Sequence, residues 1–237
     1  MKKILLLVIL ALSFSNVPGL LSQTSVPIVG KFRTIGLGVE RGDLYYTLKD
    51  SDIPVAISDG TRSVFYQCPE YKELVFYSIK TTPDLKKERL PVAKVDLTTG
   101  GSLPLIVFSP SLDKTSPPQI RILKDDLTSF PLGAFELFNL TSSPWEAVFD
   151  RKVSTLVPPY GQAMTMPQQD PSKTTLYFQP KKLAANGHQT VFCNNWVFPK
   201  NFRTLLLVQP SLGDASAPRV TRLQETADIL FEVPKKR

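Results

Sequence analysis

The residues that could carry out chemistry are few and lie far apart in the chain. The single histidine, His188, follows Asn186-Gly187, a dipeptide that favours a tight hairpin turn, so we predict an exposed histidine at the start of a strand. A catalytic histidine needs a positioned nucleophile or an orienting carboxylate, and no spacing in the sequence indicates either one. One histidine and two isolated cysteines do not make a conventional zinc site.

Aspartates are the remaining candidates for catalysis. They occur at predicted turns and at the end of a repeated segment: Asp43, Asp50, Asp52, Asp59, Asp125, Asp126 and Asp150. A glycosidase needs two carboxyl groups about 5–10 Å apart in a cleft, but aspartate is also a common turn residue. The sequence contains no GxSxG elbow, glycine-rich phosphate loop or EF-type calcium loop. We therefore predict a non-catalytic protein without a cofactor or metal.

Two cysteines and two tryptophans are the candidate site residues. Cys68 and Cys193 each lie at the edge of a strand-like run. In an oxidising compartment they form either one disulfide or two separate thiols, since sequence alone does not show whether their Cα atoms approach within about 7 Å. Trp145 and Trp196 are candidates for stacking on a ligand, although large aromatic residues in alternating strands belong more often to the core.

Two short matches to known motifs also occur. Residues 41–43 spell Arg-Gly-Asp, the tripeptide that integrins bind, but we interpret it as a tight turn into the following strand. Asn139-Leu140-Thr141 fits the N-glycosylation pattern, but the charged and apolar N-terminus is typical of a bacterial signal peptide, and in bacteria this pattern has little meaning.

The N-terminus is typical of a bacterial signal peptide. Lys2 and Lys3 precede an uncharged, mostly apolar segment, Ile4 to Phe14. This segment is well short of the roughly 20 residues that a membrane-spanning helix needs, and small residues suited to cleavage follow it. We assign residues 1–22 to the signal peptide and predict export to the periplasm or the extracellular space, with no transmembrane segment in the mature chain.

The formal net charge of +7 is spread thinly along the chain. Two of these charges belong to the signal peptide, and the other basic pairs fall mostly in predicted turns. A nucleic-acid-binding protein concentrates basic residues on one element and interleaves them with aromatic residues. We therefore predict no nucleic-acid partner, while a general attraction to anionic envelope polymers remains consistent with the charge.

An internal repeat dominates the organisation of the chain. Residues 105–125 (LIVFSPSLDKTSPPQIRILKD) and 205–225 (LLLVQPSLGDASAPRVTRLQE) are identical at seven of 21 positions. Each copy has an apolar run that predicts a strand buried on both faces, then a proline stop, a polar connection and a second strand. A weaker match relates residues 45–54 to residues 135–144.

Short strands account for most of the remaining sequence. Apolar and alternating runs are separated by 21 prolines and 12 glycines, and no long segment has helical periodicity. The sequence therefore predicts an all-β protein with two tandem, antiparallel β-sandwich-like units. We place the first unit at residues 23–127, the second at 128–233 and a basic tail at 234–237.

One segment resembles a known group of proteins. Residues 130–144 (FPLGAFELFNLTSSP), followed by Val157-Pro-Pro-Tyr-Gly161, are similar to a pattern in bacterial exported tandem β-sandwich proteins of unknown function. The resemblance implies a β-sandwich and an extracytoplasmic location, and it carries no catalytic residues. We predict an uncharacterised, exported, non-catalytic protein that binds or scaffolds a protein or polysaccharide at the cell envelope. The alternative is a carbohydrate-binding or polysaccharide-processing protein.

Overall fold

The computed structural model confirms the all-β class. It describes residues 30–68, 73–111, 116–149, 153–166, 174–180, 192–196, 199–210 and 218–226. These residues form sixteen strands and one short 3-10 helix, η1 (Leu97–Gly100). The predicted signal peptide, the basic tail and His188 lie outside the described residues. No helix of the described chain is long and apolar enough to cross a membrane.

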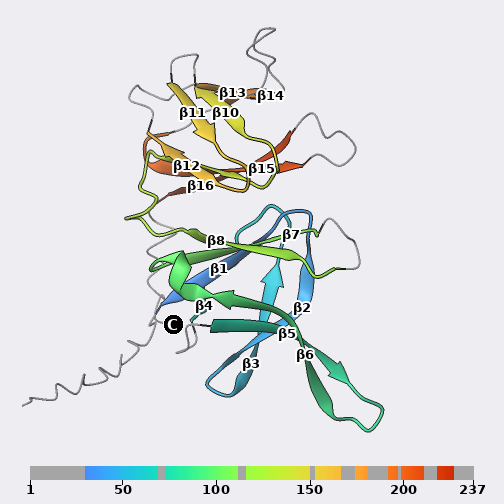
Figure 1. The fold of residues 1–237 in the computed structure, drawn as a ribbon. Coiled ribbons are helices and arrows are strands. Elements are labelled where there is room, and N and C mark those ends of the chain that lie inside the picture. The colour runs from blue at the N-terminus through green and yellow to red at the C-terminus, as the bar shows by residue number, and fades with distance from the viewer. Residues whose placement is uncertain are drawn as a thin grey trace, which may run out of the picture.

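The first eight strands form two four-stranded sheets that enclose a common core (Figure 1). The first inner sheet has the order β4 (Tyr66–Gln67), β1 (Lys31–Gly36), β7 (Pro104–Ser109) and β8 (Gln119–Lys124). The first outer sheet has the order β3 (Ser51–Ile57), β2 (Arg41–Leu48), β5 (Glu73–Thr81) and β6 (Lys87–Asp96). Strands β1 and β7 run parallel, and the other pairs are antiparallel.

The last eight strands repeat this arrangement. The second inner sheet has the order β12 (Gln162–Thr165), β9 (Phe135–Asn139), β15 (Phe202–Pro210) and β16 (Pro218–Thr226). The second outer sheet has the order β11 (Val153–Val157), β10 (Trp145–Phe149), β13 (Thr174–Pro180) and β14 (Phe192–Trp196). Each strand of the first two sheets therefore has its counterpart eight strands later in the chain, at the same place in the strand order. Strand β9 runs parallel to β15, as β1 does to β7.

The repeated segments occupy equivalent places in this arrangement. The first segment contributes residues 105–109 to β7 and 119–124 to β8, and the second contributes residues 205–210 to β15 and 218–225 to β16. Each pair is an antiparallel hairpin whose first strand lies beside a parallel strand. The register pairs Leu105 with Leu123 and Leu205 with Leu223, so the matching positions in the sequence are also matching positions in the two sheets.

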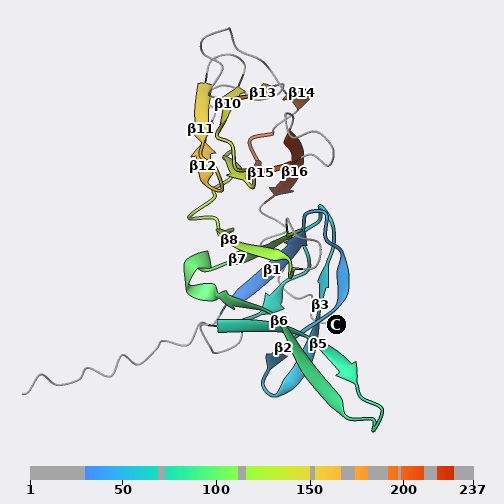
Figure 2. The same cartoon turned by 45° about the vertical axis from the view of Figure 1, so that its right-hand side comes forward.

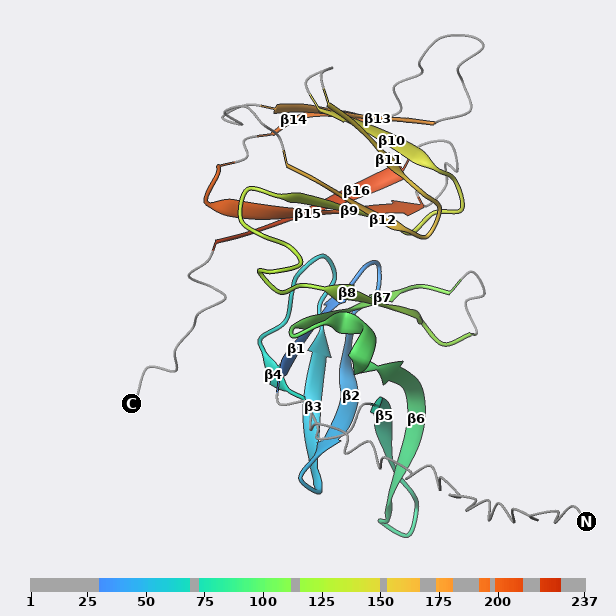
Figure 3. The ribbon, with the colours of Figure 1, turned by 60° about the vertical axis from the view of Figure 1, so that its left-hand side comes forward.

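The two inner sheets face each other, which gives four layers (Figure 3). Successive side chains of a strand point to opposite faces of its sheet. In β7, Ile106 and Phe108 contribute to the first core, while Leu105 and Val107 join a third core shared with Leu205 and other residues of the second inner sheet. The run 105–108 is therefore buried on both faces, as its sequence predicts.

Candidate functional site

A cluster of buried charged residues lies between the two inner sheets. We call it the buried charge cluster; its members are Arg33, Arg62, Asp125, Arg203 and Glu225. Every one of these side chains is 5% exposed or less. Burying so many unpaired charges would be very unfavourable, so their mutual contacts determine whether this part of the fold is stable.

Strand alternation directs four of these residues towards the space between the inner sheets, and Arg62 reaches it from the segment between β3 and β4. Arg33 is two residues before Ile35 in β1, and Ile35 belongs to the third core. Arg203 is likewise two residues before Leu205 in β15. Asp125 and Glu225 follow Leu123 and Leu223 at the same spacing, and they are equivalent positions of the repeat. Both carboxylates therefore meet at one interface because the two copies pack through equivalent faces.

Ion pairs cross from one inner sheet to the other. Arg203 donates from Nη2 to Glu225 Oε2 at 2.7 Å and lies 3.1 Å from Asp125 Oδ1. Its Nη1 also donates to the Asp125 carbonyl oxygen at 2.6 Å. Arg62 Nη2 donates to Asp125 Oδ1 at 3.0 Å, and its Nη1 lies 3.7 Å from Glu225 Oε2. Arg33 pairs with Glu225. Each carboxylate is thus shared among arginines of both halves.

These contacts also control ionisation. Burial tends to raise the pKa of Glu225, but the attraction of Arg62, Arg33 and Arg203 outweighs it and holds the pKa below its ordinary value. Burial, reinforced by Asp125, raises the pKa of the neighbouring Glu136 to about 7. Both clustered carboxylates pair with arginines, while Asp125 Oδ2 is buried without a hydrogen bond and lies 4.0 Å from Arg33 Nη1. This arrangement supports the packing of the two inner sheets.

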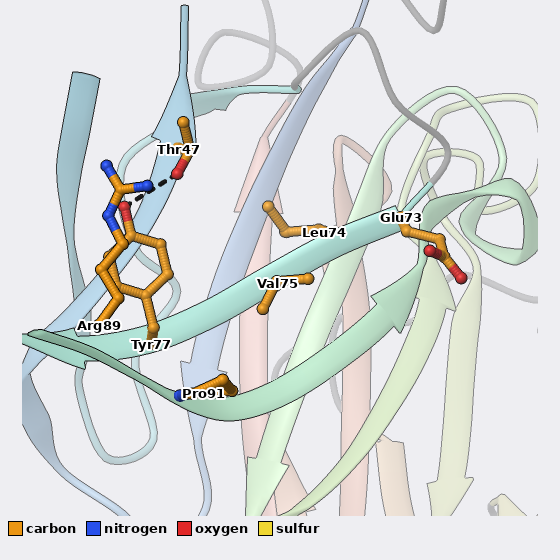
Figure 4. A pocket seen from close by; sticks show the side chains of 7 residues that line it. All are labelled: Thr47, Glu73, Leu74, Val75, Tyr77, Arg89 and Pro91. Carbon is orange, nitrogen blue, oxygen red and sulfur yellow. Dashed lines mark hydrogen bonds between the residues drawn. The ribbon is translucent and has the colours of Figure 1, made fainter. Parts of the chain in front are cut away.

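A surface pocket of about 350 Å³ lies on the first outer sheet (Figure 4). It is lined by Thr47, Glu73, Leu74, Val75, Tyr77, Arg89 and Pro91. Arg89 and Tyr77 lie together at one end, and Glu73 lies at the other. Val75, 39% exposed, contributes apolar surface between them.

The polar groups at the Tyr77 end of this pocket satisfy one another. The Arg89 guanidinium lies 5.1 Å from the centre of the Tyr77 ring and pairs with Asp52 at 2.7 Å. The Tyr77 hydroxyl donates to Asp52 and lies 3.0 Å from Thr47 Oγ1. Burial, and the hydrogen bond to Asp52, raise the pKa of Tyr77. Tyr77 is 4% exposed, because Arg89 and the stacked ring of Tyr45 cover it, so it offers no open face to a sugar.

Trp145, a predicted ligand-stacking residue, lies in the second core. It is 4% exposed and packs with Phe149 and Leu206, among other residues. Its Nε1 donates to Thr141 Oγ1 at 2.7 Å. The structure therefore gives this tryptophan a packing role, with the ring covered by the protein.

The Asn139-Leu140-Thr141 motif is part of the same buried network. Asn139 is fully buried; its Nδ2 donates to the Ser143 and Pro158 carbonyl oxygens, and its Oδ1 accepts from Thr141. In the folded chain this amide is therefore enclosed and bonded.

The other predicted site residues do not come together. Cys68 is buried in the first core with a free thiol, and burial raises its pKa to about 11. Cys193 and Trp196 lie in β14, a strand for which the structure describes the backbone and not the side chains. Cys68 follows β4 in the first inner sheet, whereas β14 belongs to the second outer sheet, and the second inner sheet lies between these two layers (Figure 3). A disulfide needs Cα atoms within about 7 Å.

The Arg-Gly-Asp segment begins β2 at an irregular register rather than forming a free loop. The Arg41 side chain donates to the Asp43 carboxylate through Nε and Nη2, at 2.9 and 2.8 Å. The two charged groups of the tripeptide thus bind each other.

Among the described residues, no group of three or more His, Cys, Asp and Glu side chains is placed to hold a metal ion. The three arginines of the buried charge cluster are not predicted by the sequence. The usable signal was the aligned Asp125 and Glu225, two carboxylates at the ends of equivalent strands. No protein-family model matches the chain, and no curated protein is similar to it in sequence.

Proposed function

We propose that the protein is an exported, non-catalytic scaffold of the bacterial cell envelope, built from two tandem β-sandwich units. The buried charge cluster carries this proposal, because it joins the inner sheets through Arg203, Asp125 and Glu225. Buried ion pairs are directional, so they favour one docking of the two sheets over others. The two outer sheets then face away from each other in a fixed geometry, which suits a protein that holds partners in place.

The outer sheets supply the surfaces for such partners. Val75 on β5 and Leu156 on β11 are 39% and 43% exposed on the outward faces of the two sheets. Because the covered Tyr77 ring offers no open face, the pocket does not specifically favour the carbohydrate-binding alternative.

The test measures where the protein is found in the cell and what its outer sheets contact. The full chain is expressed in a bacterial host with a photo-crosslinking amino acid in place of Val75, Leu156 or, as a buried control, Leu207. We expect loss of about 22 N-terminal residues by mass spectrometry, recovery in the envelope fraction, and crosslinks to envelope components from the two outer-sheet positions only. An unprocessed chain in the cytosol, or no adduct at either outer sheet, would contradict the proposal.

A further inference from the structure

The hairpin between β5 and β6 projects beyond the body of the first two sheets (Figures 1 and 2). Leu85 lies at its tip and is 84% exposed. Its backbone has a φ of 63°, in the left-handed region that leucine rarely adopts.

The tip is held in this conformation by local bonds. Leu85 N donates to the Thr82 carbonyl oxygen at 2.9 Å, and Thr82 N donates to the Lys86 carbonyl oxygen at 2.9 Å. Asp84 and Lys86 form an ion pair at 2.8 Å. This is a four-residue turn followed by a return to the strand, and glycine or asparagine is the usual residue at its left-handed position.

Neither the backbone nor the solvent favours a leucine here. Glycine would adopt the same φ without steric cost, and a polar residue would suit the exposure better. A large apolar side chain at a strained, projecting position is therefore best explained by a contact made outside the molecule.

The surroundings of Leu85 indicate the chemistry of that contact. Residues 80–89 contain four basic residues, Lys80, Lys86, Lys87 and Arg89, against two acidic ones, Asp84 and Glu88. Lys86 beside the tip is 82% exposed in its side chain. Lys86 is paired with Asp84 and Arg89 with Asp52, so the net charge of residues 80–89 is a modest +2. An apolar tip with this positive excess complements an anionic lipid surface, where the leucine enters the acyl boundary and the lysines meet the headgroups.

We propose that the β5–β6 hairpin docks the protein on an anionic membrane by inserting Leu85. The inference rests on the proposed function only for the envelope location. Vesicle binding is measured with purified protein, so its failure is separate from a failure of export.

The experiment compares the full chain with a Leu85→Gly variant on vesicles of phosphatidylglycerol and phosphatidylethanolamine, and on neutral phosphatidylcholine vesicles. Because glycine fits the left-handed φ, the variant should unfold at the same temperature as the wild type or higher. Its partition onto the anionic vesicles should fall roughly tenfold or more, as expected for the loss of one buried leucine side chain. Val64→Gly, which removes another exposed apolar side chain, serves as the matched control and should bind as the wild type does; Val64 is 71% exposed.

A second variant reports on the tip itself. The fluorescence of Leu85→Trp should be quenched by brominated lipids in anionic vesicles, independently of any contribution from the N-terminal segment. Equal binding of the wild type and Leu85→Gly, or a Leu85→Trp emission that brominated lipid leaves unchanged, would overturn the proposal. If an added envelope protein shields that tryptophan and lipid does not, the proposal is also overturned, and the tip binds a protein in place of a membrane.

Discussion

Glu136 lies on the face of β9 that points towards the first inner sheet, and it is 6% exposed. It is paired in register with Leu205, as Arg33 is with Leu105, so the repeat places an acid and a base at equivalent positions. Burial raises the pKa of Glu136 to about 7, and Asp125 adds to the effect, while Arg203 and Arg62 act against it. This carboxyl therefore couples the stability of the interface to pH.

The Glu136→Gln variant should remove that pH dependence. The ordinary pKa is 4.5, so between pH 4.5 and 7 the folded chain keeps a proton that the unfolded chain releases. Wild-type stability should then fall as pH rises through this window, by about 3 kcal/mol in total. Urea unfolding at several pH values checks this: the two proteins should differ little near pH 4.5, and the variant should be the more stable at pH 8. A difference that does not grow with pH would contradict the assignment.

The end of β1 depends on a close backbone approach at Gly36. The Gly36 amide donates to the Ser58 carbonyl oxygen at 2.9 Å, and Gly60 N donates back to the Gly36 carbonyl oxygen at 2.8 Å. A Cβ atom at Gly36 would lie 1.9 Å from the Val39 carbonyl oxygen. The strand can therefore leave the sheet here only because this residue has no side chain.

Gly36→Ala should destabilise the protein by about 2–4 kcal/mol, because backbone atoms must move to make room. Gly42→Ala is the matched control, since a Cβ there meets nothing within 4 Å. The control should stay within about 0.5 kcal/mol of the wild type. Chemical denaturation measures the free energy of unfolding of both variants. Equal values for Gly36→Ala and Gly42→Ala would show that the end of β1 can relax.

The packing of the two inner sheets determines the shape of the whole molecule. The third core joins residues of both halves, and the buried charge cluster completes the same interface. Arg203 is central, because one guanidinium bonds to Asp125, Glu225 and the Phe130 carbonyl oxygen. A lysine at this position could not reproduce that planar set of bonds.

Arg203→Met should destabilise the protein by about 3–5 kcal/mol, because it removes one of the three arginines that offset the charge of the two buried carboxylates. Calorimetry should then resolve two transitions in place of one, as the two sheet pairs lose their coupling. Arg219→Met provides the control. The Arg219 side chain is 54% exposed and its ion pair with Asp59 is long, at 4.0 Å, so the change should cost about 0.5 kcal/mol or less. If both variants unfold alike in a single transition, the cluster does not couple the two halves.

The sequence by itself determined the all-β class and the repeated hairpin. Short alternating runs and frequent prolines exclude long helices, and a run such as 105–108 is apolar at every position because both of its faces are buried. The matched segments also predicted equivalent places in the fold, since equal patterns of apolar residues and proline stops require equal pairing.

Only the tertiary structure decided what covers the second face of each inner sheet. Arg33 alternates with the buried Phe32 in β1, which on sequence alone is typical of a residue facing solvent. It is buried because the second inner sheet packs over that face and supplies Glu225. Periodicity tells which face a residue occupies, but the chemistry opposite that face comes from residues about a hundred positions or more away.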